Sequence, residues 1–458
     1  MSTVDPRVWR IGTVTVLGTV MSVLDTTIVN VALEPLAREL DASLGAISWI
    51  VTAYLLAIAA VTPAASWASR RLGARRTYLL SLLLFTLGSL GCGLAWDTRS
   101  LVVARVLQGA AGGLLMPVGQ SIIVKAAGHG NLGRVMGVLG VPTVLAPVVG
   151  PTLGGFLLET VSWRAIFLIN VPIGVLAYVL GLRLLPRDAG APTYRLDVLG
   201  LLLASVSLSL VTYGLSEVAA DPAIGRAEVI GPVVVGAVLL GVFVRHALRR
   251  DHPLLDLRLF ADRAYGLASF GVLVNGAISL GGLILLPLYL QGVRGESATT
   301  TGLLVAPTAV GVVLVMSQAG RWTDRYGGGR VATAGTAILT VATFPLALVD
   351  DHTSYWYITG WMLLRGIGTG LAGMPLMAAA LTSIAQAKSP DASAQLFVLQ
   401  RVGGSLGTAA LVVVLERTAD FGFTYGVVAV LTALSLVPCL ALAASDRRRR
   451  ALVPAPAV

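Results

Sequence analysis

Two short stretches decide the fold of this chain: SWASRRLGARR at residues 66–76 and GRWTDRYGGGR at residues 320–330. Each places several arginines around a glycine, Gly73 or Gly327, between two long apolar runs. Such a turn is typical of a loop on the cytoplasmic side of a membrane, because Lys and Arg concentrate there. Its recurrence predicts two related halves, each built from membrane-spanning segments.

Apolar runs continue on both sides of these turns along the whole chain. The 458 residues are 56% hydrophobic and 12% charged, about half the ~25% charge of a soluble domain. A spanning helix needs about 20 mostly apolar residues, and the runs lack the alternation of a membrane β-strand. The sequence therefore predicts an all-α, polytopic membrane protein, in which the twelfth span is overlong and is expected to end near Leu376. The fourteen predicted spans are 11–33, 46–66, 77–96, 100–123, 135–157, 165–184, 197–216, 229–247, 265–290, 300–320, 331–349, 354–384, 393–415 and 424–444.

The distribution of basic residues tests this number of spans. With the N-terminus inside, 24 of the 33 Lys and Arg residues fall in inside segments, including the terminal run 447–450, and six fall outside. This asymmetry predicts that both termini are cytoplasmic. The net charge of +10 is spread along the chain and so does not indicate nucleic-acid binding, which concentrates charge on one surface. The first span lacks a cleavage site and is expected to be retained.

The predicted spans divide into six, two and six. We expect an N-terminal six-helix half at 1–190, an inserted helix pair at 191–255 and a C-terminal half at 256–458. Transporters built from such repeats bind substrate at the interface between the halves, near the middle of the membrane.

One carboxylate lies deep in the first apolar run, at Asp25. A charged Asp at a helix centre costs ~2.5–3.5 kcal/mol, so such residues usually line an interior pathway. Asp25 is expected ~13 Å below the outer membrane boundary and Arg105 ~8 Å below it, so the two can meet across a cavity. Asp25 is predicted to exchange a proton for substrate. The alternative interpretation is that Asp25 is a structural carboxylate, held by hydrogen bonds to its neighbours. For Arg105, the alternative is a structural ion pair.

Several of these segments together resemble the major facilitator superfamily, specifically its fourteen-helix drug:H⁺ antiporters. The resemblance runs from the first span to the fourteenth and includes WRAIFLINVPIG at 163–174. The motifs that carry it are LDTTIVNVAL through Asp25, Asn30 and Ala32, LVVARVLQGAAGG through Arg105, Gln108, Gly109 and Gly113, and GVLGVPTVLAPVVGPTLGG through Pro147, Gly150, Pro151, Gly154 and Gly155.

Two segments depart from the family pattern. Where the family usually has Gly and Asp after the second span, this chain has Ser66 and Arg70, whereas Asp324 keeps the pattern in the second copy. Glu34 stands where the family usually has proline. Glu34 is a second candidate for proton coupling, and its alternative is an ordinary solvated acid beside Arg38.

The resemblance implies an exporter that alternates between inward-open and outward-open states. It gives the fifth-span residues Pro147, Gly150, Pro151 and Gly154 a role in antiport direction and proton sealing, although packing would explain the glycines equally well. The paired turns are expected to fasten helices and control opening through Arg71, Gly73, Asp324, Arg325 and Gly327. Their alternative role is a positive-inside signal only.

The function predicted from these features is proton-coupled efflux of hydrophobic, cationic drugs by a monomer in the bacterial plasma membrane, with no cofactor or metal. One alternative is a dedicated exporter of a single metabolite or antibiotic. Another, of a different class, is a passive channel or a membrane sensor. An enzyme is not indicated, since GGSLG at 403–407 lies in a helical span with no histidine near it. The predicted substrate contacts are Asp25, Asn30, Tyr54, Gln108, Tyr213 and Arg365.

Overall fold

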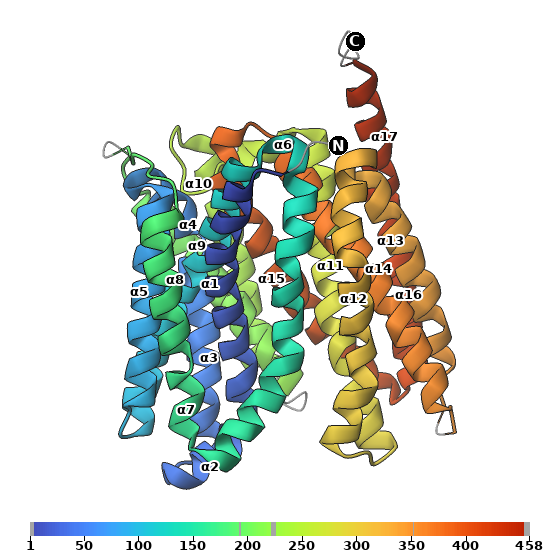
Figure 1. Cartoon of the computed structure of the whole chain (residues 1–458). Coiled ribbons are helices and arrows are strands. Elements are labelled where there is room, and N and C mark those ends of the chain that lie inside the picture. Colours follow the sequence, from blue (N-terminus) through green and yellow to red (C-terminus); the bar gives the residue numbers. More distant parts are fainter. Residues whose placement is uncertain (1–3, 192–193, 221–225, 351, 453–458) are drawn as a thin grey trace.

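The computed structural model describes residues 4–191, 194–220, 226–350 and 352–452, and within these ranges it contains helices and no strand. The two halves stand side by side, with the first described residues of α1 and the last of α17 at the same face (Figure 1). We call this the termini face. The N-terminal half contains α1 (Pro6–Val31), α2 (Leu33–Glu39), α3 (Leu44–Val61), α4 (Ala64–Leu72), α5 (Ala74–Gly93), α6 (Thr98–Thr160), α7 (Trp163–Leu168) and α8 (Asn170–Leu184).

The C-terminal half follows an inserted pair, α9 (Val198–Ala220) and α10 (Arg226–Arg249). Its remaining elements include short 3₁₀ turns and one π turn. They are η1 (Leu257–Ala261), α11 (Arg263–Leu288), η2 (Tyr289–Val293), α12 (Ala298–Tyr326), α13 (Gly328–Thr343), η3 (Phe344–Leu348), α14 (Tyr355–Thr382), η4 (Gln386–Lys388), α15 (Ser389–Thr418), α16 (Phe421–Leu434) and α17 (Leu436–Leu452).

Among the described residues, twelve helices are long and apolar enough to cross a membrane, and fourteen when each of two bent pairs counts as one span. The predicted all-α membrane fold with fourteen spans is therefore confirmed. The expected end of the twelfth span near Leu376 is wrong, because α14 continues to Thr382. Its last turns are buried among other C-terminal helices, with Ala378 and Leu381 at most 1% exposed.

The ends of the helices follow from their sequences. Ser43 and Ser297 accept hydrogen bonds from backbone N–H groups in the first turns of α3 and α12, and Asp97 forms a capping box with Ser100 at the start of α6. Such side chains satisfy N–H groups that have no partner within the helix. Gly128, with a φ of 64°, divides α6 into two spans.

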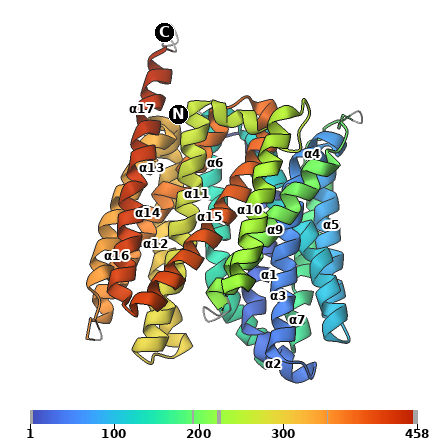
Figure 2. The same ribbon diagram turned by 180° about the vertical axis from the view of Figure 1, so that it is seen from behind.

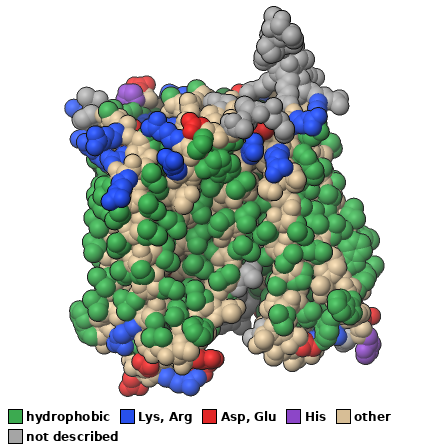
Figure 3. Space-filling model, in the orientation of Figure 1, with side chains coloured by type: hydrophobic (Ala, Val, Ile, Leu, Met, Phe, Trp, Pro, Cys, Tyr) green, Lys and Arg blue, Asp and Glu red, His purple; other side chains and the backbone are tan. Residues whose placement is uncertain are grey.

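The repeat predicted from the two arginine-rich turns appears in the backbone itself. Gly73 joins α4 to α5 with φ 90° and ψ 145°, and Gly327 joins α12 to α13 with φ 95° and ψ 145°. Only glycine adopts such a conformation without a steric penalty. Both turns lie at the termini face, where Lys and Arg side chains gather (Figure 3). The side chains of 447–450 lie outside the described residues.

The inserted pair lies over the seam between the halves. Seen from behind, α9 and α10 stand beside α15 (Figure 2), and α9 contacts both α3 and α15. Tyr213 stacks on Trp49 of α3 with ring centroids 6.5 Å apart, and Ser205 donates a hydrogen bond to the Ala60 carbonyl at 2.5 Å. On the other side, Val211 packs against Ala409 of α15. The inserted pair therefore covers one side of the interface between the halves.

A polar pair fixes the two inserted helices to each other near the termini face. Nε2 of His246, on α10, lies 2.8 Å from Oδ1 of Asp197, which also accepts from the Gly200 N–H at 3.0 Å. Burial would raise the pKa of the Asp197 carboxyl, but these hydrogen bonds hold it below its usual range.

Candidate functional site

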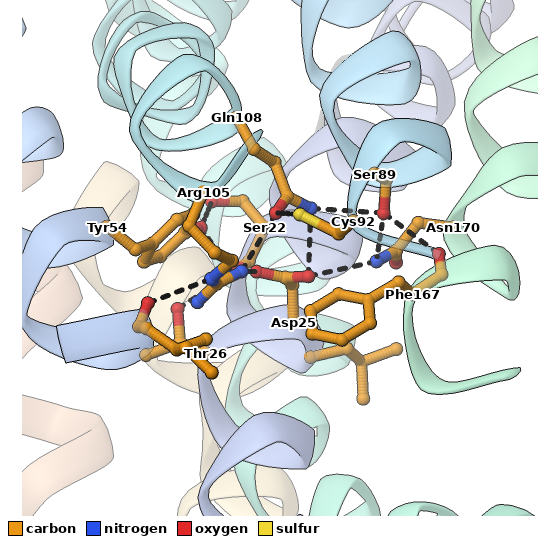
Figure 4. Close-up of polar contacts among 12 residues, drawn as sticks. Ser22, Asp25, Thr26, Tyr54, Ser89, Cys92, Arg105, Gln108, Phe167 and Asn170 are labelled. Atoms are coloured by element: carbon orange, nitrogen blue, oxygen red, sulfur yellow. Dashed lines mark hydrogen bonds and ion pairs between the residues drawn. The ribbon is translucent and has the colours of Figure 1, made fainter. Parts of the chain in front are cut away.

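The N-terminal half contains a buried ion pair between Asp25 of α1 and Arg105 of α6. Both side chains are 0% exposed. Nη1 of Arg105 donates to Oδ2 of Asp25, and its Nε donates to the Ile50 carbonyl at 3.0 Å (Figure 4). The ring of Tyr54 covers the guanidinium, with its centroid 3.9 Å from Cζ. The prediction that Asp25 and Arg105 lie at similar depth is confirmed, although the two meet in direct contact rather than across a cavity.

Amide side chains complete the cluster around the carboxylate. Nε2 of Gln108 donates to Oδ1 of Asp25 at 2.9 Å, and Nδ2 of Asn170 donates to the same oxygen at 3.1 Å. Both amides also donate to Oγ of Ser89, at 3.0 and 3.1 Å. The hydroxyl of Ser89 in turn donates to the Phe167 carbonyl at 2.8 Å. Four helices, α1, α5, α6 and α8, therefore converge on one carboxylate (Figure 4).

Small residues allow these helices to approach closely. A Cβ on Gly109 would lie 2.5 Å from the Tyr54 carbonyl oxygen, and one on Gly88 would lie 2.8 Å from Cβ of Gln108. Similar glycine contacts are common where membrane helices pack, since close approach adds van der Waals contact. Gly109 of the fourth-span motif thus brings α6 against α3, and Gly88 of α5 lets Gln108 approach that helix.

Two polar atoms in this cluster have no hydrogen-bond partner: Nη2 of Arg105 and Oδ1 of Asn170. An unsatisfied buried polar group costs about 1–3 kcal/mol, and more when it is charged. The cluster is thus incompletely satisfied in this conformation. The unpaired Nη2 of Arg105 could donate a hydrogen bond to a rearranged side chain, and the unpaired Oδ1 of Asn170 could accept one.

Glu34 lies on the surface, in contrast to Asp25. Its carboxylate pairs with Arg38 at 2.6 Å, and the two side chains are 72% and 73% exposed. Exposed ion pairs four residues apart on a helix contribute about 0.3–0.5 kcal/mol. This geometry matches the alternative reading of Glu34 as a solvated acid, and its role in proton coupling stays a prediction.

We expect Glu34→Gln to leave transport and stability nearly unchanged, with the free energy of unfolding altered by less than about 0.5 kcal/mol. Thermal unfolding and substrate-driven proton flux in vesicles measure the two effects. A loss of flux comparable to that of an Asp25 variant would place Glu34 in the proton pathway.

A cavity of about 370 Å³ lies between the two halves. Both halves line it, through α1 and α6 on one side and α11, α12, α14 and α15 on the other. No Asp, Glu, Lys or Arg is among the described residues that line it. Its polar lining consists of Thr15, Thr19, Gln120, Thr143, Asn275, Ser279, Thr369 and Gln400.

Methionine dominates the apolar part of this lining. Of the eight methionines in the chain, five face the cavity, and these are Met116, Met136, Met316, Met374 and Met377. Methionine is flexible and polarisable, and protein surfaces that accept many ligands use it heavily. One aromatic residue, Phe397, also lines it, and the rest of the apolar lining is aliphatic, formed by Val16, Ile123, Leu139, Val144 and Val312.

None of the six predicted substrate contacts lines this cavity in the conformation described. Asp25, Tyr54 and Gln108 are buried within the N-terminal half, and Asn30 is exposed near the end of α1. Tyr213, on α9 of the inserted pair, stacks on Trp49 of α3. The substrate roles of these residues stay predictions. The cavity residues escaped the sequence analysis because they are uncharged and spread over six helices.

Arg365 is a buried cation in the C-terminal half. It is 3% exposed, and its Nη2 donates to the Ile278 carbonyl at 3.2 Å. Within the described chain, no salt bridge neutralises it and its Nε has no hydrogen-bond partner. Gly282 of α11 lies against it, since a Cβ there would be 2.0 Å from Nη2. In the first half, Asp25 of α1 pairs with the buried arginine Arg105. In the second half, the residue that α11 places against the buried arginine Arg365 is a glycine, Gly282.

Arg70 joins the halves at the termini face. Its Nη2 pairs with Oδ1 of Asp391 in the first turn of α15, and its Nη1 donates to the Tyr194 hydroxyl at 2.6 Å. Asp391 also accepts from Ser66 at 2.5 Å and is 2% exposed. The two residues that depart from the family pattern after the second span, Ser66 and Arg70, therefore act together on one acid of the opposite half.

Asp324 forms the second connection between the halves. Its two carboxylate oxygens accept hydrogen bonds from the backbone N–H groups of Gly133 and Arg134 on α6, at 2.8 and 2.9 Å. A Cβ on Gly133 would lie 2.7 Å from that carboxylate and from the Gly320 carbonyl. We call this contact and the Arg70–Asp391 pair the two latches. Both close the termini face, whereas the surface is hollowed between the halves at the opposite end (Figure 3).

The other predicted gating residues lie near these latches or along α6. Nη1 of Arg71 donates to the Tyr194 carbonyl at 3.3 Å, and Arg325 lies over the Tyr326 ring at 5.2 Å. Gly150 and Gly154 pack on α1, where a Cβ would lie 2.1 Å from Thr27 Oγ1 and 3.2 Å from Ile28. Pro147 and Pro151 lie within the same helix. The gating roles of all these residues stay predictions.

Two side chains of these polar contacts were not predicted from the sequence: Asn170 and Asp391. Asn170 is a polar residue inside an otherwise apolar span, and this was the available signal. Asp391 lies 321 residues from Arg70, so no local pattern connects them. Within the described ranges, no three His, Cys, Asp or Glu side chains lie close enough to hold a metal ion.

Comparison with known proteins places this geometry in a family. The model of the Major Facilitator Superfamily matches residues 15–408. The chain is 37% identical over 414 residues to the "Multidrug resistance protein B homolog" of Mycobacterium tuberculosis (strain ATCC 25618 / H37Rv), covering 90% of this chain and 77% of that protein. It is 32% identical over 365 residues to the "Putative multidrug resistance protein MdtD" of Escherichia coli O6:K15:H31 (strain 536 / UPEC), covering 79% and 76%.

Solved structures share the fold at low identity. The human organic anion transporter MFSD10 (TETRAN) matches with a TM-score of 0.68 and 15% identity, covering 95% of this chain and 100% of that one. The proton:xylose symporter XylE, bound to 6-bromo-6-deoxy-D-glucose, matches with a TM-score of 0.62 and 14% identity, covering 95% of each chain. With two helical halves, the shared fold and a family model that matches most of its length, this multi-pass membrane chain belongs to the Major Facilitator Superfamily.

Proposed function

We propose that this protein exports small, largely apolar molecules across the bacterial plasma membrane in exchange for protons, with the termini face in the cytoplasm. The observation that carries the proposal is the position of the buried Asp25–Arg105 pair on α1 and α6, two of the helices that line the central cavity. Thr19 lines the cavity six residues before Asp25 on α1, which is ~9 Å along the helix.

Coupling follows from this arrangement. Protonation of Asp25 would remove one charge of the pair and change the packing of α1 against α6. The same helices present Thr15, Thr19 and Met116 to the cavity. A proton on Asp25 is thereby linked to the shape of the substrate site, without direct contact between Asp25 and substrate. Either ligand can shift the equilibrium only through its differential affinity for the two states.

The cavity also informs the class of substrate. Its methionine-rich lining suits hydrophobic molecules of varied shape. The names of the relatives, which refer to multidrug resistance, point to the same class of substrate. Because the lining has no acid, a substrate with a localised positive charge would lose hydration there without gaining a counter-ion. The proposal therefore favours neutral or charge-delocalised molecules that hydrogen-bond to Thr, Asn or Gln.

The driving force available from the proton gradient also favours neutral substrates. A proton crossing ~100 mV contributes ~2.3 kcal/mol, and one pH unit contributes ~1.4 kcal/mol. Exchange of one proton for one monovalent cation is electroneutral, so only the pH difference drives it, for about a tenfold gradient. A neutral substrate uses both contributions and can be concentrated several hundredfold.

The proposal is tested in everted vesicles that carry a pH gradient reported by a fluorescent dye. We expect neutral and cationic hydrophobic compounds to release protons from wild-type vesicles, and Asp25→Asn to abolish the release. Glu34→Gln is the matched control, since it removes an exposed carboxylate near the end of the same helix. Release that persists in Asp25→Asn would exclude Asp25 as the coupling residue. A flux of substrate that ignores the gradient would favour a passive channel, and a wild type that responds to one compound alone would favour a dedicated exporter.

A further inference from the structure

The N-terminal half has a strongly basic pocket at the termini face, apart from the cavity and the latches. It lies between α1, the start of α5 and the end of α8, and its volume is about 610 Å³. Five arginines and one acid line it. They are Arg7, Arg10, Arg75, Arg183, Arg187 and Asp5.

Both nearby carboxylates bind backbone N–H groups rather than the guanidinium groups of these arginines. Asp5 accepts a hydrogen bond from the Arg7 backbone N–H at 2.7 Å and so caps α1. Asp188 accepts from the backbone N–H groups of Ala74 and Arg75, at 2.6 and 3.1 Å, and so caps α5. Among the described residues, none of the five arginines forms a salt bridge.

One of the five arginines is held in place. Nη2 of Arg75 donates to the Leu182 carbonyl at 2.7 Å, while its buried Nε has no hydrogen-bond partner. A second chamber of about 370 Å³ shares Asp5, Arg7 and Arg75 with the first and adds one cation, Lys125, and one acid, Asp188. The pocket thus concentrates positive charge around an open space.

From this charge and position we infer that the pocket binds a phosphate-bearing anion, and that an anionic phospholipid headgroup is its source. Arginine suits phosphate because its planar fork donates two parallel hydrogen bonds. Basic pockets between membrane helices on the cytoplasmic side are suited to anionic headgroups. The outer rim includes Leu182, which is 46% exposed on the apolar surface of α8. A headgroup in the pocket would therefore leave its acyl chains against a surface that suits them.

The inference is independent of the transported substrate and is tested on the purified full-length protein in neutral detergent. Native mass spectrometry would follow binding of phosphatidylglycerol and of phosphatidylcholine, with inorganic phosphate as a soluble competitor. The site variant is Arg10→Gln/Arg183→Gln/Arg187→Gln, because these side chains are exposed. The matched control is Arg249→Gln/Arg321→Gln/Arg330→Gln, which removes three exposed arginines outside this pocket. Thermal unfolding checks that both variants fold.

We expect the wild type and the control to bind phosphatidylglycerol in preference to phosphatidylcholine. The site variant should bind phosphatidylglycerol on the order of 100-fold more weakly, since each basic side chain near an anionic surface contributes about fivefold. Binding of inorganic phosphate, lost in the site variant, with no preference for phosphatidylglycerol would support the anion site and assign it a soluble source. An equal loss in both variants, or a wild type that binds neither anion, would overturn the inference.

Discussion

Replacement of Arg105 by glutamine is expected to lower the free energy of unfolding by about 3–5 kcal/mol, because it leaves the Asp25 carboxylate buried without its counter-ion. Both side chains are fully buried, so water cannot replace the lost partner. Arg105 also donates to Ile50 and stacks on Tyr54. The measurement is chemical or thermal unfolding of the purified protein in one detergent, with Arg99→Gln at the exposed start of α6 as the matched control.

The double variant Asp25→Asn/Arg105→Gln distinguishes two effects on the free energy of unfolding. One is the destabilisation caused by an unpaired buried charge, and the other is the net contribution of the ion pair itself. Once both charges are absent, we expect much of the stability to return, since neutral replacement of a buried ion pair is often tolerated. Proton-coupled export should nevertheless remain abolished. If Arg105→Gln alone unfolds like the wild type, then Asp25 is not charged in the folded protein, or water reaches it.

Loss of the Arg70–Asp391 latch is expected to shift the protein toward the state in which the termini face is open. Asp391 is 2% exposed, and after Arg70→Ala the Ser66 hydroxyl would remain as its side-chain hydrogen-bond donor. The Arg70 side chain is 22% exposed, so we discount the cost of a fully buried pair to about 2–3 kcal/mol. This corresponds to a 30- to 150-fold change in the ratio of closed to open molecules.

Spin labels on the two halves measure this shift as a distance distribution. Arg76→Cys and Arg330→Cys provide exposed positions at the termini face, and the native Cys92 and Cys439 are at most 1% exposed. Arg321→Ala removes an arginine from the same face as a control. The reversed pair Arg70→Asp/Asp391→Arg should restore part of the closed population. A distance distribution in Arg70→Ala identical to that of the wild type would show that the remaining contacts between the halves, such as Asp324 with α6, are enough to keep this face closed.

The sequence predicted the architecture well because its signals are local. Each span is an apolar run, and the turns at Gly73 and Gly327 repeat both the charge pattern and the backbone conformation. Asp25 and Arg105 could be matched in depth because an α-helix advances ~1.5 Å per residue. Their direct contact was not predictable, because depth does not fix how a helix is rotated about its axis.

The cavity and the Arg70–Asp391 latch could not be predicted from the sequence for a related reason. The cavity residues are neutral and come from six helices, and each resembles an ordinary packing residue in its own span. Asp391 lies in the first turn of α15, just before the apolar part of its span, and its partner is in the other half. Contacts between halves depend on the three-dimensional arrangement of helices, which hydropathy does not encode.

The two sides of α9 differ in a way that determines where motion can occur. Toward α3 it has a hydrogen bond from Ser205 and a stacked Tyr213. Toward α15 its contacts include Val211 and Leu215 with Ala409, and within the described residues no hydrogen bond joins the two helices. When the halves rock, the inserted pair should travel with the N-terminal half, and shear should occur along α15, where smooth apolar contacts slide with little resistance. Lipid tails would thereby stay out of the interface as the halves move, and among the described residues no hydrogen bond between α9 and α15 would have to break.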